Sequence, residues 1–355
     1  MAHLKTKKLT KLLSILLALI FMLGTFVCCG KNDVEETTAE PTTVGTTAPP
    51  PVYRNPLTGE EGYDKTLLNN RPVLVSVENH PDARPQWGLT SSDIVWEMVA
   101  EGGITRMLLM YADVSRMPDK LGPTRSARHY FVELAGGFDA IFVHFGGSTY
   151  AYNYIKKYNV DDIDGMSAGS AFFRDKSRGV ATEHTAYTTK DAITKHIADK
   201  EMRTELKDSY DSPFKFNKST KALTGGNCNE ITVSFSSGYT YKYTFESAKG
   251  VYLSTLNGNK FVDSDGTQQN FENIIVCYTT ISSMNDSKGR VTFDLSSGKG
   301  VYVSNGTYQN ITWEKGDYSD MMKFYNEDGN ELSLNPGRSY IAICDKSRES
   351  YNTIA

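Results

Sequence analysis

Apolar residues first gather near the start of the chain, directly after a cluster of lysines. Four lysines, at positions 5, 7, 8 and 11, precede an apolar stretch over residues 12–27. A basic segment followed by an apolar stretch that is short for a membrane span is typical of a secretory signal peptide. This pattern predicts that the protein is exported.

A cysteine pair ends this apolar stretch, in the order Val27-Cys28-Cys29-Gly30. The order resembles a bacterial lipobox, in which a small residue precedes a cysteine that is lipidated and becomes the new N-terminus. We expect residues 1–28 to be the signal peptide and Cys29 to be lipidated, which would anchor the protein to the outer face of the cytoplasmic membrane. An uncleaved anchor and ordinary secretion are the alternatives.

Threonine, proline, glutamate and alanine dominate residues 29–55, where large apolar residues are few. Such a segment cannot bury enough apolar surface to fold by itself. We therefore expect a disordered Thr/Pro-rich tether between the lipid anchor and the folded part of the protein.

Residues 56–212 contain both strand-like and helix-like patterns. Runs of apolar and β-branched residues predict strands over residues 71–79 and 138–147. Helical spacing of apolar residues predicts one helix over residues 149–158 and another that begins at residue 189. This part of the chain is expected to be a mixed α/β domain.

A hairpin is predicted inside this first domain. Residues 93–100 and 104–112 are both strand-like, and Glu101-Gly102-Gly103 between them can adopt the positive φ values of a tight turn. Glu97 lies in the first strand and Arg106 in the second, so the two side chains could form a salt bridge across the hairpin. Such pairs are common and contribute little when exposed, so a structural and a functional role are equally supported.

From residue 213 onward the pattern changes to short alternating runs, separated by glycine turns about every eight to twelve residues, as in antiparallel β domains. The predicted fold class is α+β, with a mixed α/β N-terminal domain over residues 56–212 and an antiparallel β-rich C-terminal domain over residues 213–355. Strands are expected over residues 231–235, 240–245, 274–278, 291–295, 300–304, 310–313, 322–325 and 339–344.

Net charge argues against one class of partner. The whole chain has a formal charge of −4, and removal of residues 1–28 takes away four lysines and no acidic residue, which changes the formal charge to −8. A net acidic body is not typical of proteins that bind nucleic acid. We therefore expect no nucleic-acid partner, and any anion site has to be local.

Three cysteines follow the lipobox, at Cys228, Cys277 and Cys344. In an exported protein they allow one disulfide at most, although small buried apolar residues are the favoured role for at least two of them. Neither a CxxC motif nor a Cys/His spacing typical of metal sites occurs in the chain. The spacing therefore predicts no metal site, and we expect no cofactor.

A second cluster of charge lies in residues 122–129, GPTRSARH. Proline and threonine predict a helix start here, which places Arg125 and Arg128 in the first turn, where the positive end of the helix dipole disfavours them. A negative group should compensate the two arginines. It is either an internal carboxylate or, with a slight preference, a bound phosphate or carboxylate. The candidate internal carboxylates are Glu97, Glu101 and Asp113.

Four further residues are candidates for a ligand site. Asn79 ends a predicted strand, where functional loops tend to lie, and His129 directly follows the arginine segment. His144 is near the end of a buried strand and is more typical of a core histidine with a backbone partner than of a site residue. The full set of candidate anion- or ligand-binding residues is Arg106, Arg125, Arg128, His129, Glu97, Glu101, Asn79, His144 and His184.

Several of these motifs resemble the YerB-like lipoproteins of Gram-positive bacteria. The most specific are EGGITR at residues 101–106 and GPTRSAR at residues 122–128, and HFGG follows at residues 144–147. The resemblance extends over nearly the whole mature chain, although Glu183-His184-Thr185 stands where that family usually has Pro-His-Asn. It implies an envelope location and a two-domain architecture, but no reaction.

Three functions are compatible with these patterns. The favoured one is a non-enzymatic, membrane-anchored binding or accessory protein of the cell envelope, whose arginines bind an acidic group of a cell-wall polymer or of an envelope protein. The second is a cell-envelope hydrolase or transferase in which Glu97 or Glu101 and a histidine act as acid and base. The third is a structural scaffold in which the arginines pair with internal carboxylates and a partner binds the β domain.

Overall fold

The computed structural model describes residues 51–210 and 212–355. The predicted signal peptide, the lipidated Cys29 and residues 29–50 of the predicted tether lie outside these residues. The tether prediction extends too far at its C-terminal end, because Arg54 pairs with Glu61 in a β-bridge and the buried side chain of Asn55 donates a hydrogen bond to Asp93 at 2.9 Å.

A mixed sheet of 11 strands forms the centre of the protein. Its strands are β1 (Val73–Glu78), β2 (Ile94–Val99), β3 (Thr105–Tyr111), β4 (Ile141–His144), β5 (Asp162–Asp164), β9 (Gly226–Asn227), β15 (Asn273–Thr279), β18 (Ser297–Ser304), β19 (Thr307–Glu314), β20 (Lys323–Tyr325) and β22 (Ser339–Asp345). The order is β20-β19-β18-β15-β22-β2-β3-β1-β4-β5, and β9 pairs with β19.

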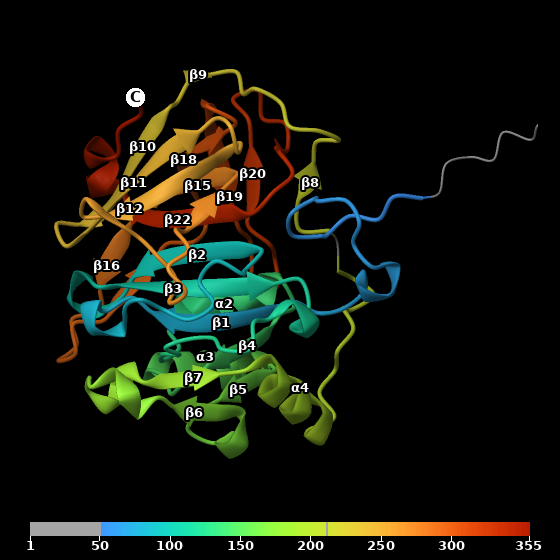
Figure 1. Cartoon of the computed structure of the whole chain (residues 1–355), viewed down its shortest axis with the longest axis vertical. Helices are drawn as coiled ribbons and strands as arrows, with labels where there is room; N and C mark the ends of the chain where they lie inside the picture. Colours follow the sequence, from blue (N-terminus) through green and yellow to red (C-terminus); the bar gives the residue numbers. More distant parts are fainter. Residues whose placement is uncertain (1–50, 211) are drawn as a thin grey trace, which may run out of the picture. The chain divides into compact units, whose positions relative to one another are not determined.

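The same sheet includes strands from both halves of the sequence. In Figure 1 the red strand β22 lies between β15 and the teal strand β2, and β22 is parallel to both neighbours. The helices α2 (His129–Gly137), α3 (Thr149–Tyr158) and α4 (Lys190–Asp199) all precede residue 213, and the chain after that residue is rich in antiparallel strands. The α+β fold class is therefore confirmed, while residues 51–355 form one compact unit.

Layers of side chains cover the two faces of this sheet. On one face, Leu74, Trp96 and Leu108 share a core with Tyr130 and Leu134 of α2. The other face packs against α4 and against a second sheet of five strands. That second sheet comprises β10 (Glu230–Ser236), β11 (Tyr239–Glu246), β12 (Val251–Leu256), β13 (Asn259–Lys260) and β14 (Asn270–Phe271).

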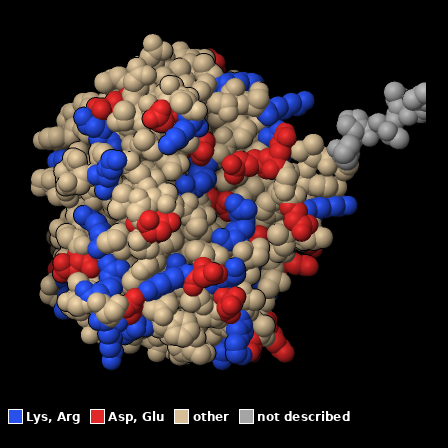
Figure 2. All heavy atoms as spheres, viewed as in Figure 1, with Lys and Arg blue, Asp and Glu red and all other residues tan. Residues whose placement is uncertain are grey.

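Three short two-stranded sheets complete the fold. They pair β6 (Phe172–Arg174) with β7 (Ala186–Thr188), β8 (Lys215–Phe216) with β21 (Ser333–Leu334), and β16 (Ile281–Ser283) with β17 (Val291–Phe293). Within the described residues, no helix is both long and apolar enough to cross a membrane. Figure 2 shows acidic and basic side chains intermixed over the visible face.

The predicted hairpin is confirmed by the antiparallel pairing of β2 with β3 across Glu101–Gly103. The predicted helix over residues 149–158 is also confirmed, since α3 has these bounds and the Ser148 side chain accepts a hydrogen bond from the Ala151 N–H. All eight strands expected after residue 213 are present, but β12 and the short strands β8, β9, β13, β14, β16 and β21 were not predicted. The three cysteines of the described chain are buried and free.

The helix start predicted at Pro123 and Thr124 is wrong. Helix α2 begins at His129, with Arg128 as its N-cap residue, so neither arginine lies in the first turn. The preceding segment is extended along β1, where the Arg125 N–H donates to the Ser76 carbonyl at 2.9 Å. Because the N–H groups of this segment donate to the carbonyls of Ser76 in β1, Ala186 and Gly146, the segment has no need of helical hydrogen bonds.

Candidate functional site

The parallel strands β1, β4 and β5 end at the same edge of the main sheet. Their last residues are Glu78, His144 and Asp164. In open α/β sheets, ligands bind outside the carboxyl ends of the parallel strands, where loops and helix starts converge. Functional side chains are therefore expected at this edge.

Glu78 is the centre of a buried charge cluster at the edge. One carboxylate oxygen lies 3.1 Å from Nε of Arg125, and the other lies 2.9 Å from Nδ1 of His184. Glu78 and His184 are both buried, and 106 residues separate them in the chain. Strand β1, the extended segment before α2 and the 3-10 turn Thr182–His184 thus each supply one member of this cluster.

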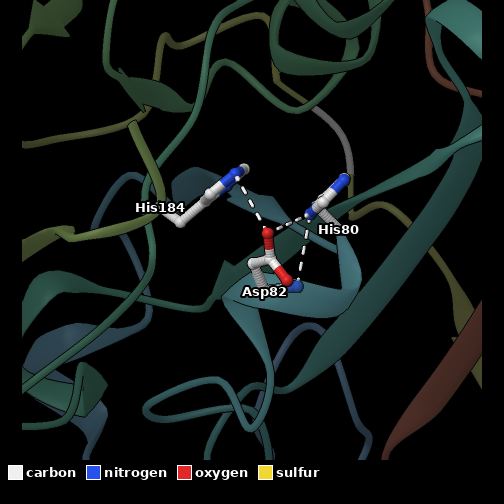
Figure 3. A group of neighbouring side chains, drawn as sticks. All are labelled: His80, Asp82 and His184. Carbon is white, nitrogen blue, oxygen red and sulfur yellow. Dashed lines mark hydrogen bonds and ion pairs between the residues drawn. The ribbon is translucent and has the colours of Figure 1, made fainter. Parts of the chain in front are cut away.

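Two further side chains approach His184 from the turn that follows β1. The rings of His80 and His184 are stacked, with centroids 4.6 Å apart and planes 9° apart. The Asp82 carboxylate lies 3.7 Å from Nδ1 of His80 and 4.0 Å from Nε2 of His184 (Figure 3). Glu183 also lies near His184, with 3.6 Å between its Oε1 and Nε2.

A pocket of about 470 Å³ opens beside this cluster. Its charged lining residues are Arg125, Arg174 and Glu183, and its exposed apolar contacts are Tyr152 and Met166. Glu183 also forms an ion pair with Arg125, in which Oε2 of Glu183 lies 3.5 Å from Nη2 of Arg125. The pocket therefore combines two guanidinium groups with apolar side chains at the carboxyl edge of the sheet.

A larger hollow of about 620 Å³ lies elsewhere, beside residues 314–325. Its Lys315 is buried and donates to the carbonyl oxygens of Asp317 and Tyr318. The buried cation of this hollow is thus already bound to the backbone, which makes the hollow a weaker candidate for a ligand site.

The predicted pairing of Glu97 with Arg106 is wrong. In the hairpin register, Glu97 faces Met107 and Arg106 faces Met98. Because neighbouring residues of a strand point to opposite faces of the sheet, this register places the two charged side chains on opposite faces. The observed pairing differs by one residue from the register that would place Glu97 opposite Arg106.

Arg106 and Arg128 lie together on the α2 face of the sheet. Arg128 makes a two-pronged ion pair with Glu101, with both N···O distances 2.5 Å, while Arg106 donates to the Ser126 carbonyl at 2.8 Å. Burial and the nearby charge of Arg128 lower the pKa of Arg106 to about 10. Burial raises the pKa of Glu101, but Arg128 outweighs this effect and the net shift is downward.

Internal carboxylates therefore compensate both arginines of the 122–129 segment. Glu101 is the partner of Arg128, as one of the alternatives predicted, whereas Glu78 and Glu183 pair with Arg125 and were not among the candidates. Asp113 instead accepts a hydrogen bond from Tyr63 at 2.8 Å. The role of Glu78 could not be predicted from sequence spacing, because its partners come from distant segments.

Glu97 lies in the layer between the two large sheets. Its carboxylate is fully buried and accepts hydrogen bonds from Asn79, Thr105, Tyr241 and Tyr340. Burial raises its pKa, and the four donors offset part of that rise. Such a closed set of donors leaves this carboxylate no route to a substrate.

The other two predicted histidines are separate from the cluster. His129 is buried beneath Thr292, with 3.0 Å between Nε2 and the hydroxyl oxygen, and burial lowers its pKa. His144 has no exposed surface and contacts the Gly146 carbonyl and the Asp162 carboxylate. Among the described residues, no hydrogen bond or ion pair joins Glu97 or Glu101 to a histidine, so the acid–base pairs of the enzyme hypothesis are not assembled.

A further sequence pattern lies at this edge. Residues 165–169, GMSAG, match the GxSxG pattern of some hydrolases. The Ser167 hydroxyl, however, donates to the Asp164 carbonyl at 3.3 Å, and no histidine accepts from it among the described residues. The pattern thus lacks the nucleophile–base contact that this chemistry requires.

Comparison with known proteins gives consistent matches over most of the chain. Residues 57–203 match the family described as "Protein of unknown function (DUF3048) N-terminal domain", and residues 231–341 match its C-terminal domain. "Putative lipoprotein YerB" of Bacillus subtilis (strain 168) is 32% identical over 333 residues, which covers 92% of this chain and 93% of that protein.

A solved structure has the same fold. The crystal structure of the YerB protein from Bacillus subtilis matches with a TM-score of 0.75 and 30% sequence identity, over 85% of this chain and 99% of the other. With both domains matched and a full-length relative at this identity, the chain belongs to the DUF3048 family.

Proposed function

We propose that this protein is a lipoprotein anchored through Cys29 to the outer face of the cytoplasmic membrane, and that it binds an anionic group of a cell-wall polymer. The lysine-rich start, the apolar stretch and the Cys28-Cys29 pair support the anchor. The name of the similar Bacillus subtilis protein supports a lipoprotein as well.

The proposed ligand site is the pocket lined by Arg125, Arg174 and Glu183, which we call the carboxyl-edge pocket. One observation carries this proposal: two guanidinium groups and two exposed apolar side chains line one hollow at the edge where α/β proteins bind ligands. Guanidinium groups are well suited to carboxylate and phosphate oxygens. The apolar contacts suit a sugar or peptide that carries the anionic group.

This site contains only one of the three arginines that the sequence predicted. Arg125 remains a candidate, but Arg106 is buried and bound to the Ser126 carbonyl, and Arg128 is paired with Glu101. Arg174 takes their place as the second ligand-binding arginine. Its guanidinium also donates to a backbone carbonyl, that of Thr182, and lies 4.7 Å from the centroid of the Phe145 ring, but unlike Arg106 it is exposed on the pocket wall.

Binding of purified anionic wall fragments to the mature protein in detergent tests this proposal. Arg174→Gln should weaken binding by about ten- to a hundredfold, because a charge-assisted hydrogen bond contributes roughly 1.5–3 kcal/mol. Glu183→Gln should strengthen binding, because it removes the acidic side chain that competes for Arg125. Calorimetric titration with muropeptides and with glycerol-phosphate polymers measures both effects.

Arg290→Gln is the matched control, because Arg290 also forms an ion pair but lies outside the pocket. It should bind the fragments as tightly as the wild-type protein does. The proposal fails if no fragment binds the wild-type protein, or if Arg174→Gln and Arg290→Gln bind equally well. Binding of an envelope protein without any wall fragment would favour a protein partner instead.

A further inference from the structure

We propose that His80, Asp82 and His184 form a binding site for a divalent transition-metal ion, with Zn²⁺ as the best fit. Each residue offers one ligand atom, and the three atoms all lie within 4.8 Å of one another. Two imidazoles and one carboxylate are a frequent ligand set of zinc sites that keep a position open. This site lies beside the carboxyl-edge pocket and goes beyond the ligand binding proposed there.

The distances between the ligand atoms are close to those of a tetrahedral site. Zinc–nitrogen and zinc–oxygen bonds of about 2.0–2.2 Å place neighbouring ligand atoms about 3.3 Å apart. The Asp82 carboxylate is already 3.7 Å from His80 and 4.0 Å from His184. The two contacts of Asp82 therefore need a contraction of less than about 1 Å to match these distances.

His184 is already oriented as a metal ligand. Its Nδ1 donates to the buried carboxylate of Glu78 at 2.9 Å, which leaves the lone pair on Nε2, the nitrogen that faces Asp82. Arg125 holds the other oxygen of Glu78 at 3.1 Å. A carboxylate behind a ligating histidine fixes its tautomer and ring orientation in metal sites. Glu78 is thus a positioning residue, which orients His184 and does not bind the metal ion itself.

The other two ligands can move to meet the ion. His80 is 32% exposed and Asp82 is 56% exposed, and both belong to the short turn that follows β1. The His80 ring is stacked parallel to the His184 ring, so their in-plane lone pairs do not converge on one point. Nδ1 of His80 also accepts a hydrogen bond from the Asp82 N–H at 3.2 Å, so metal binding requires the His80 ring to turn out of this stack and to give up that hydrogen bond.

The Asp82 carboxylate is free to bind a cation. The ion-pair partners of Asp82 among the described residues are the two histidines, and the Glu183 carboxylate lies 3.6 Å from Nε2 of His184. Two arginines line the hollow beside Asp82, but Arg84 donates to the Asn79 carbonyl and Arg178 to the Pro85 carbonyl. The carboxylate of Asp82 is thus free of guanidinium partners.

Metal titration of the mature protein in detergent, after removal of bound metal with a chelator, tests this site. The wild-type protein should bind one Zn²⁺ per chain, and Co²⁺ in its place should give the visible absorption of a four-coordinate site. His80→Ala and Asp82→Asn should each weaken binding by about tenfold or more. Both residues are at least partly exposed, so these variants should keep their fold, which circular dichroism checks.

His196→Ala is the matched control, since His196 is a partly exposed histidine on α4, away from the cluster. It should bind the metal as the wild-type protein does. The inference is overturned if the wild-type protein binds less than one ion per chain, or if His80→Ala and Asp82→Asn bind as tightly as His196→Ala. Arg174→Gln should keep metal binding, so a failure of the anion pocket and a failure of the metal site are distinguishable.

Discussion

At the scale of single residues, Glu97 carries the largest conflict between charge and environment. Its carboxylate has no exposed surface, yet four side chains from β3, β11, β22 and the end of β1 donate hydrogen bonds to it. A buried carboxyl group resists ionisation because it loses its hydration. The hydrogen bonds reduce this cost without removing it, and the pKa of Glu97 remains raised.

Replacing Glu97 with glutamine should change how stability depends on pH. A carboxyl group whose pKa is raised by folding stabilises the protein below its unfolded-state pKa of about 4.3, and this contribution is lost as pH rises through the folded-state pKa. Glu97→Gln removes that loss, so its free energy of unfolding should improve relative to the wild-type protein as pH rises. Each unit of pKa difference contributes about 1.4 kcal/mol. Denaturant unfolding between pH 4 and pH 8 measures the trend.

Glu101→Gln provides the control of opposite sign. The pKa of Glu101 is lowered in the folded protein, so its contribution is present above the unfolded-state pKa and is lost as pH falls through the folded-state pKa. Glu101→Gln should therefore lose stability relative to the wild-type protein as pH rises from the lowered folded-state pKa to the unfolded-state pKa of about 4.3, so for this variant the unfolding measurements extend to about pH 3. Equal pH trends for the two variants would contradict the assignment.

The arginines of the 122–129 segment show how far a single sequence can identify an ion pair. Arg125 and Arg128 were recognisable in the sequence as charges that need a partner, and the structure supplies Glu78 and Glu101. Neither arginine needs a bound anion to compensate its charge, but a single sequence does not reveal which distant carboxylate approaches. Only Arg125 retains access to a pocket.

At the scale of elements, glycines decide how closely the strands of the C-terminal half approach. A Cβ atom on Gly300 of β18 would lie 2.4 Å from the Val276 carbonyl oxygen of the paired strand β15. By contrast, a Cβ atom on Gly238, between β10 and β11, would meet nothing within 4 Å. Gly300 is therefore required by packing, and Gly238 is not.

Gly300→Ala should destabilise the protein by about 1–3 kcal/mol, because the added methyl group forces β15 and β18 apart. Gly238→Ala makes the same chemical change where there is space, and its effect should stay within about 0.5 kcal/mol. Urea unfolding of both variants measures the difference. Equal stability of the two would show that the backbone at β18 adjusts without cost.

Elements were predictable to different degrees. Helix α3 has a clear start at Ser148, and the hairpin has its glycine turn, so both could be located from local signals. The segment before α2 misled the prediction, because proline and threonine also occur in extended chain that pairs with a strand edge. β12 was missed even though Gly250 and Asn257-Gly258 bracket it.

At the scale of the whole molecule, the main sheet unites the two sequence segments that the family comparison distinguishes. Tyr340 of β22 donates to Glu97 of β2, although 243 residues separate them in the chain. The two matched regions, residues 57–203 and 231–341, each contribute strands to this sheet. The helix-containing and β-rich segments therefore share one framework.

The predicted lipid anchor, which would fix where the whole molecule lies, can be tested by mutation. Cys29→Ala should prevent lipidation, so the chain should lose incorporation of labelled fatty acid. Cys28→Ala is the control: alanine is a small residue suited to the position before a lipidated cysteine, so labelling should continue. Metabolic labelling followed by fractionation measures both. Labelling that survives in Cys29→Ala and disappears in Cys28→Ala would move the anchor to Cys28.

The sequence by itself determined the features that depend on neighbouring residues: the export signal as a prediction, the hairpin, helix α3, and the change from mixed α/β to β-rich chain near residue 213. Only the tertiary structure decided which strands are neighbours, and therefore which side chains meet. The single-residue register that separates Glu97 from Arg106 is set by the whole sheet. Glu78 and His184 meet across 106 residues for the same reason, because contacts between distant segments leave no signal in local spacing.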